Sequence, residues 1–166
     1  MTFRCYTSRH WSSQIRPLAK MGQNAVRTLL FEKVMKEARV LLADSHKLML
    51  EGLSYLLRPT FEVVGLVSDT KSLLEVADTL KPDVAVVDLS MPSFNNANVV
   101  RQLKVRNPEL KVIVLSVYDE PEVINKILAT GVSGYVLTRS AAWDLIPAIL
   151  KVLQGQTYVS PALRWR

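Results

Sequence analysis

Short apolar runs alternate with helix-like periodicities from Arg39 to the end of the chain. The apolar runs predict strands at 39–43, 61–67, 84–87, 111–117 and 134–137. Apolar residues at helical spacing predict helices at 45–58, 68–80, 95–106, 119–131 and 140–155. Strands this apolar are typical of a parallel sheet buried on both faces. Because crossover connections are right-handed, we expect a doubly wound α/β fold.

The ends of these predicted helices carry typical capping residues. Ser68 or Asp69 is expected to cap the second helix, and Asp119 the fourth. Pro147 lies inside the last predicted helix, where proline removes a hydrogen bond and clashes with the preceding turn. The sequence leaves two interpretations open: either this helix starts near Asp144, or it is kinked.

The positive charge of the chain is concentrated at its start. The sequence has 166 residues and a net charge of +6. Residues 1–34 carry six basic residues against Glu32 alone, a charge of +5, while the other fifteen basic and fourteen acidic residues give +1. A nucleic-acid or membrane arm is one interpretation of such a segment. The preferred ones are a disordered, transit-peptide-like leader or a natural start of translation at Met35.

These observations predict the domain boundaries and the cellular compartment of the protein. We expect a basic leader at 1–34, one folded domain at 35–160 and a short linker stub at 161–166. No apolar run reaches the roughly 18 residues of a membrane span, so no membrane association is expected. Cys5 is the single cysteine, which excludes an internal disulfide and fits a reducing, cytoplasmic compartment.

Polar residues stand at the carboxyl ends of the predicted strands. Ligands of open α/β sheets bind beyond these ends. Carboxylates there hold Mg²⁺ through hard oxygen ligands. A buried carboxylate such as that of Asp88 is expensive unless it is paired or used by the site. The residues concerned are Asp44, Ser45, Asp88, Ser116, Thr138 and Arg139.

Five segments in order carry a resemblance to a known family. They read VLLADSHKLMLEGL, KPDVAVVDLSMP, VIVLSVYDE, GVSGYVL and ILKVLQGQTYVSPAL, within residues 38–162. In content and spacing they resemble the receiver domain of two-component response regulators, NarL/LuxR-type branch. The resemblance implies a flavodoxin-like fold with five strands in the order 2-1-3-4-5. It also implies a signalling domain rather than an enzyme, with a histidine kinase or other signalling protein as partner, and a homodimer as one form.

The resemblance assigns roles residue by residue. It implies Asp88 as the phosphoacceptor, with Mg²⁺ held at Asp44, Asp88 and Ser90. Ser116 falls on the switch hydroxyl, Tyr135 on the switch aromatic, and Thr138 on the catalytic position that the family fills with lysine. Ser45 and Thr138 depart from the pattern, since the family has an acid and a lysine there. The loop at Asn95-Asn96-Ala97 also lacks the usual glycine.

Both departures weaken phosphoryl chemistry on physical grounds. Ser45 removes one of three carboxylates, so the affinity for Mg²⁺ should fall. Thr138 removes the cation that stabilises the phosphoryl oxygens, and positioned positive charge is the main catalyst of phosphoryl transfer. Arg139 is adjacent, but strand alternation points it away from Thr138.

Ordinary structural roles compete with several of these assignments. Asp44 or Ser45 could cap the first helix, and for Ser45 this role is preferred. His46 is expected to be structural rather than a ligand, and Trp143 to pack in the core. Ser116 has the alternative of a plain strand-end serine, and Tyr135 of a core aromatic.

Three functions remain open on the sequence. The first is a receiver-like module that docks or dimerises with weakened phosphorylation. The second is a fully phosphorylatable receiver or a truncated transcriptional regulator. The third is a small phosphotransferase or hydrolase, which the missing acid, lysine and glycine-rich loop disfavour. Because the sequence stops at ALRWR, without a recognition helix, no direct DNA binding is expected.

Overall fold

The computed structural model describes residues 37–91 and 96–163, all within the second of two units into which the chain divides, Met35–Arg166. The predicted leader at 1–34, Asn95 of the altered loop and residues 164–166 lie outside the described residues. The elements are β1 (Arg39–Ala43), α2 (Lys47–Leu57), β2 (Glu62–Val67), α3 (Thr70–Leu80), β3 (Val84–Asp88), α4 (Asn96–Arg106), β4 (Lys111–Ser116), α5 (Pro121–Leu128), β5 (Gly134–Leu137), the 3₁₀ turn η2 (Thr138–Ser140), α6 (Ala141–Leu153), β6 (Tyr158–Val159) and η3 (Pro161–Leu163).

The strands form one parallel sheet in the order β2-β1-β3-β4-β5-β6. This confirms the predicted fold class and the order 2-1-3-4-5 and adds a sixth strand at the edge. That strand, Tyr158–Val159, pairs with Gly134 and Tyr135 of β5. Two residues are too few to show a periodicity, which is why the sequence pattern missed them.

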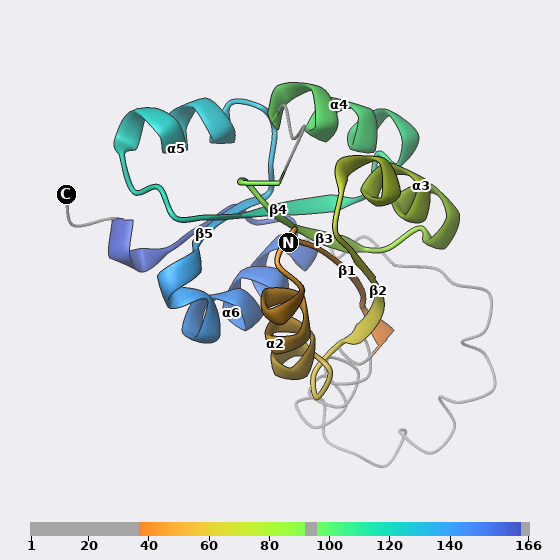
Figure 1. Ribbon diagram of the computed structural model, residues 1–166. Coiled ribbons are helices and arrows are strands. Elements are labelled where there is room, and N and C mark those ends of the chain that lie inside the picture. The colour runs from red at the N-terminus through yellow and green to blue at the C-terminus, as the bar shows by residue number, and fades with distance from the viewer. Residues whose placement is uncertain (1–36, 92–95, 164–166) are drawn as a thin grey trace, which may run out of the picture. The chain divides into compact units, whose positions relative to one another are not determined.

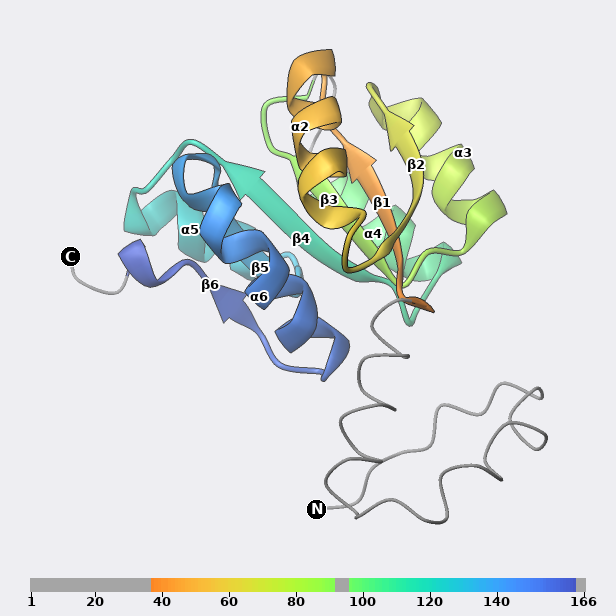
Figure 2. The ribbon, with the colours of Figure 1, turned by 90° about the horizontal axis from the view of Figure 1, so that it is seen from below.

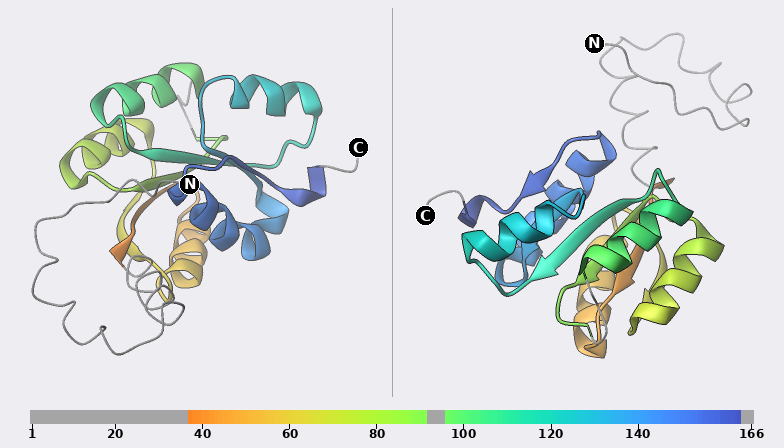
Figure 3. Two further views of the ribbon diagram at one scale, coloured as in Figure 1. Left: turned by 180° about the vertical axis from the view of Figure 1, so that it is seen from behind. Right: turned by 90° about the horizontal axis from the view of Figure 1, so that it is seen from above.

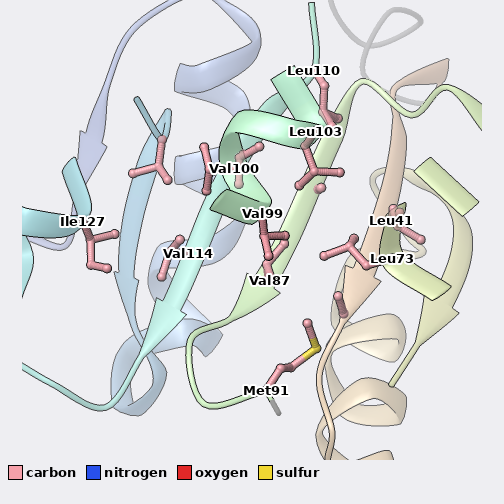
Figure 4. Packing of buried hydrophobic residues seen from close by; sticks show 14 of the residues in the cluster. Leu41, Leu73, Val87, Met91, Val99, Val100, Leu103, Leu110, Val114 and Ile127 are labelled. Atoms are coloured by element: carbon pink, nitrogen blue, oxygen red, sulfur yellow. The ribbon is translucent and has the colours of Figure 1, made fainter. Parts of the chain in front are cut away.

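The helices form a layer on each face of the sheet (Figure 1). α2 and α6 cover one face (Figure 2), and α3, α4 and α5 cover the other (Figure 3). Each face has its own hydrophobic core. Figure 4 shows the core on the face covered by α3, α4 and α5. There, Leu73 of α3 and Val99 and Leu103 of α4 pack against Leu41 and Val87 of the strands. The central strands β3 and β4 are buried on both faces of the sheet, so polar side chains that act on a ligand are expected at their ends.

Some predicted helix ends are confirmed and others are wrong. Asp69 caps α3 by accepting a hydrogen bond from the Ser72 N–H at 2.9 Å. The cap of α5 is Glu120 and not Asp119, whose carboxylate contacts Arg139 instead. α6 begins at Ala141 and includes Pro147, so the interpretation that it starts near Asp144 is wrong.

Candidate functional site

The buried carboxylates of Asp44 and Asp88 lie at neighbouring strand ends. Ala43 of β1 pairs with Val87 of β3 in parallel register, so the next residue of each strand projects at the same edge. The two side chains are enclosed by the protein, with Asp44 3% and Asp88 7% exposed. Ser90 adds a hydroxyl that donates to Asp88 Oδ2. The structure therefore brings together the three predicted metal-binding positions.

His46 joins this pair, which the sequence analysis did not expect. Its backbone N–H donates to Asp44 Oδ1 at 2.7 Å, and its ring Nδ1 lies 3.0 Å from the same oxygen. One ligand atom from each of Asp44, His46 and Asp88 lies within 4.8 Å of the others. We call these three residues the Asp88 cluster. The sequence feature that could have predicted the contact between His46 and Asp44 is their two-residue spacing at the start of a helix, where an Asp side chain can accept the N–H two residues later.

Asp88 is held where its charged form is unfavourable. Burial raises the pKa of the Asp88 carboxyl above its ordinary value, and the Asp44 carboxylate raises it further. The hydrogen bond from Ser90 and the nearby His46 act in the opposite direction without cancelling the effect. A bound cation would stabilise the charged form of a carboxylate in this state.

The two predicted switch residues are linked through the loop that follows β4. The Tyr118 N–H donates to Ser116 Oγ at 3.1 Å, and the Tyr135 hydroxyl donates to the Tyr118 carbonyl at 2.8 Å. Tyr135 is fully buried, as expected of a core aromatic, and burial raises the pKa of its phenol. Two hydrogen bonds to the Tyr118 backbone thus connect Ser116, at the end of β4, with Tyr135 of β5.

Positive charge is scarce at the position that the family fills with lysine. Thr138 Oγ1 is buried and has no hydrogen-bond partner among the described residues. Arg139 contacts Asp119, with its Nη2 3.0 Å from Asp119 Oδ2. Both Thr138 and Arg139 lie in the 3₁₀ turn η2 and not in strand β5, so strand alternation does not set the direction of Arg139.

Two structural expectations are wrong. Neither Asp44 nor Ser45 is the N-cap of the first helix: α2 has His46 there, without a side-chain capping hydrogen bond, and the Asp44 carboxylate accepts the His46 N–H. Trp143 does not pack in the core but is 80% exposed on α6. Its place in the helix puts the indole on the solvent side, whereas Leu145 two residues later is buried.

Residues 40–150 match the response regulator receiver domain. The chain belongs to this family. It is 37% identical over 125 residues to the transcriptional regulatory protein DegU of Brevibacillus brevis, covering 74% of this chain and 53% of DegU. It is 32% identical over 127 residues to the response regulator GacA of Pseudomonas viridiflava, covering 75% of this chain and 59% of GacA. The chain thus spans little more than half the length of these relatives.

Solved receiver domains share the fold. The isolated receiver domain of RcsB from Salmonella enterica serovar Typhimurium, with a beryllofluoride phosphomimetic, aligns with a TM-score of 0.70 and 26% identity, over 76% of this chain and 96% of RcsB's domain. The receiver domain of NarL from Mycobacterium tuberculosis aligns with a TM-score of 0.67 and 29% identity, over 73% and 99% of the two chains. These matches confirm the NarL/LuxR-type resemblance.

Family membership carries general properties. Receiver domains are signalling domains rather than classical enzymes, they interact with histidine kinases, and they bind Mg²⁺ at an acidic pocket. Within the described part of the chain, every helix is too short or too polar to cross a membrane.

The donor set of the Asp88 cluster fits Mg²⁺ poorly. Mg²⁺ prefers oxygen ligands and near-ideal octahedral geometry. The two carboxylates meet that demand and Ser90 adds an oxygen beside Asp88, but the third member of the cluster offers an imidazole nitrogen. Ser45, at the position of the family's second acid, contributes no carboxylate.

Proposed function

We propose that this chain is a signalling receiver domain in which phosphoryl chemistry at Asp88 is weakened and the output is protein–protein interaction. The observation that carries the proposal is Thr138 at the lysine position. A buried hydroxyl there, without a hydrogen-bond partner among the described residues, offers a phosphoryl group no positive charge. Aspartyl phosphate formation at Asp88 therefore lacks its usual electrostatic stabilisation.

Arg139, the cation next to Thr138 in the described part of the chain, is not free to act as a substitute. Arg139 is engaged by Asp119, and moving it would break a charge-assisted hydrogen bond. Asp44 contributes a second negative charge beside Asp88, and a phosphoryl group would add more. Repulsion at this strand edge thus favours the unphosphorylated carboxylate.

In this proposal, a structural change at the site is transmitted to a partner protein by the loop that follows β4. Ser116 and Tyr135 are both bonded to the backbone of Tyr118, so a shift of either reaches this loop. Val117 and Tyr118 expose apolar side chains there, which is the surface on which we propose a signalling protein or a second copy docks.

The test compares phosphoryl uptake by wild type and by Ser45→Asp/Thr138→Lys. Each protein is incubated with acetyl phosphate and Mg²⁺, and the aspartyl phosphate is followed by intact mass. We expect poor uptake by wild type and at least about tenfold faster uptake by the double variant. Each single substitution should help less, because metal and lysine stabilise the same developing charge.

Asp88→Asn in both backgrounds is the control and should abolish uptake. If wild type takes up phosphoryl as readily as the double variant, the weakened chemistry is refuted. Uptake that survives Asp88→Asn would remove Asp88 as the phosphoacceptor.

A second candidate is a fully phosphorylatable receiver. It is favoured by the presence of Asp88, Ser116 and Tyr135 in their expected places, with the Ser116–Tyr135 link formed. The relatives DegU and GacA are a transcriptional regulator and a response regulator, so a role in transcription through further residues or partners belongs to this candidate. Rapid wild-type uptake in the test above would select it.

A further inference from the structure

We propose that Asp44, His46 and Asp88 form a divalent-metal site that prefers a nitrogen-accepting ion such as Zn²⁺ to Mg²⁺. The proposal deepens the proposed function, since it names the class of ion that would occupy this carboxylate pair when the third acid is missing. It follows from the mismatch between the donor set and Mg²⁺. Imidazole suits Zn²⁺ and related ions, whereas Mg²⁺ selects carboxylate, carbonyl and water.

The spacing of the three ligand atoms is compatible with one ion. Neighbouring ligands of a tetrahedral Zn²⁺ lie roughly 3–3.5 Å apart, given bond lengths of about 2.0–2.2 Å. His46 Nδ1 and Asp44 Oδ1 are already 3.0 Å apart, and all three ligand atoms lie within 4.8 Å of one another. Three protein ligands would leave a fourth position for water, as in open zinc sites.

A metal bound at Nδ1 would replace the hydrogen through which this atom contacts the Asp44 carboxylate. A metal at Nδ1 requires the ring proton to sit on Nε2, and the His46 side chain is 72% exposed, so water can accept that proton's hydrogen bond. The hydroxyl of Ser90 donates to Asp88 and orients its carboxylate, as groups behind metal ligands commonly do. An ion of charge +2 would also relieve the repulsion between Asp44 and Asp88.

His46 can be replaced without losing the helix that it begins. It is the N-cap residue of α2, but its side chain makes no capping hydrogen bond. Asparagine is among the best N-cap residues, so His46→Asn keeps the helix start while removing the imidazole. This separates a ligand role from a structural one.

The experiment is a calorimetric titration of the full chain, free of any polyhistidine tag, with ZnCl₂ and separately with MgCl₂. The background carries Cys5→Ser and His10→Ala, because these are the other thiol and imidazole of the chain. We expect Zn²⁺ to bind at least about ten times more tightly than Mg²⁺. His46→Asn should weaken Zn²⁺ binding by about tenfold or more and change Mg²⁺ binding less than about twofold.

Two further readouts make the outcome decisive. In ¹⁵N-imidazole spectra, Zn²⁺ should shift the Nδ1 resonance of His46. In the titration, Ser45→Asp should strengthen Mg²⁺ binding and so reduce the ratio of Zn²⁺ affinity to Mg²⁺ affinity. Zn²⁺ affinity unchanged by His46→Asn, or an unshifted Nδ1 resonance at saturation, would overturn the proposal. Because no phosphoryl donor is present, a failure here is distinct from a failure of the phosphorylation proposal.

Discussion

Two carboxylates of this domain, the buried Asp88 and the half-buried Asp144, have opposite surroundings. Asp144 Oδ2 accepts hydrogen bonds from the hydroxyls of Ser140 at 2.7 Å and Ser160 at 2.6 Å. Ser160 Oγ in turn accepts the N–H of Leu137 at 3.0 Å. We call Ser140, Asp144 and Ser160 the Asp144 cluster. It ties the end of β5, the start of α6 and the segment after β6 together.

The Asp88 cluster lacks this balance. Asp88 faces a second carboxylate, and its pKa is raised by burial and by Asp44. The Asp144 cluster meets a negative charge with donors, so it is expected to stabilise the fold. The Asp88 cluster keeps negative charges together at the ligand-binding edge, which is expected to cost stability. The difference teaches that satisfied polar groups mark structure, whereas crowded like charges mark a site.

The largest expected effect is that of Asp144→Ala. The buried Ser160 hydroxyl would lose its charged acceptor, so we expect a loss of about 2–3 kcal/mol in the free energy of unfolding. Urea unfolding measures it. Glu122→Ala is the matched control, because Glu122 is also in the first turn of a helix but exposed. Equal losses in both variants would contradict a structural role for the Asp144 cluster.

Ser160→Ala should have the next largest effect, about 1–2 kcal/mol, because it leaves the buried N–H of Leu137 without its acceptor. Ser140→Ala is its partner variant and should lose less, since Ser140 is only half-buried and its hydroxyl is the donor in its contacts with the Leu137 carbonyl and the Asp144 carboxylate. Thermal unfolding compares the two. A larger loss of stability for Ser140→Ala than for Ser160→Ala would contradict this prediction.

Asp88→Asn should change stability in the opposite direction. A raised pKa in the folded state means that folding disfavours the charged carboxylate, so the variant should gain stability at neutral pH. The gain should shrink as the pH falls through the raised folded pKa and vanish below the ordinary value near 3.8, where both states are protonated. A gain of about 1 kcal/mol would raise the Tm by roughly 2–4 °C.

Asp78→Asn supplies the contrast for that measurement. Lys81 lowers the pKa of the exposed Asp78 carboxyl through a hydrogen bond and its charge, so this variant should not gain stability at neutral pH. If Asp88→Asn instead lost more than about 2 kcal/mol, Asp88 would belong with Asp144 among structural carboxylates.

The smallest expected effect is that of deleting residues 1–34. We propose that the domain begins at Met35, so the shortened chain should unfold at the same Tm and with both clusters responding as in the full chain. Differential scanning calorimetry of the two chains tests this. A clear fall in Tm on deletion would show that residues 1–34 contribute to the stability of the domain.

The sequence determined the fold class and most of the element order, because hydrophobic periodicity records burial directly. It also located Asp44, Asp88, Ser116 and Thr138 at strand ends, since parallel strands place their carboxyl ends at one edge. Local capping was less secure: Asp69 was right, but Asp119 and Ser45 were not. The Asp119 carboxylate contacts Arg139, twenty residues later in the chain, and the helix after β1 begins with His46, whose N–H donates to the Asp44 carboxylate, as its N-cap in place of Ser45.

Tertiary structure alone decided which polar side chains meet. His46 lies beside the carboxylates because the chain leaves β1 and begins α2 within three residues, so the ring folds back on Asp44. Ser160 reaches Asp144 only because the two-residue strand β6 aligns beside β5. The approach of His46 to Asp88 and the Ser160–Asp144 hydrogen bond depend on distances across the fold, and residues sixteen or more apart in the chain leave no periodic signal. Hydrophobic pattern therefore builds the sheet, and the packing of the sheet selects the chemistry at its edge.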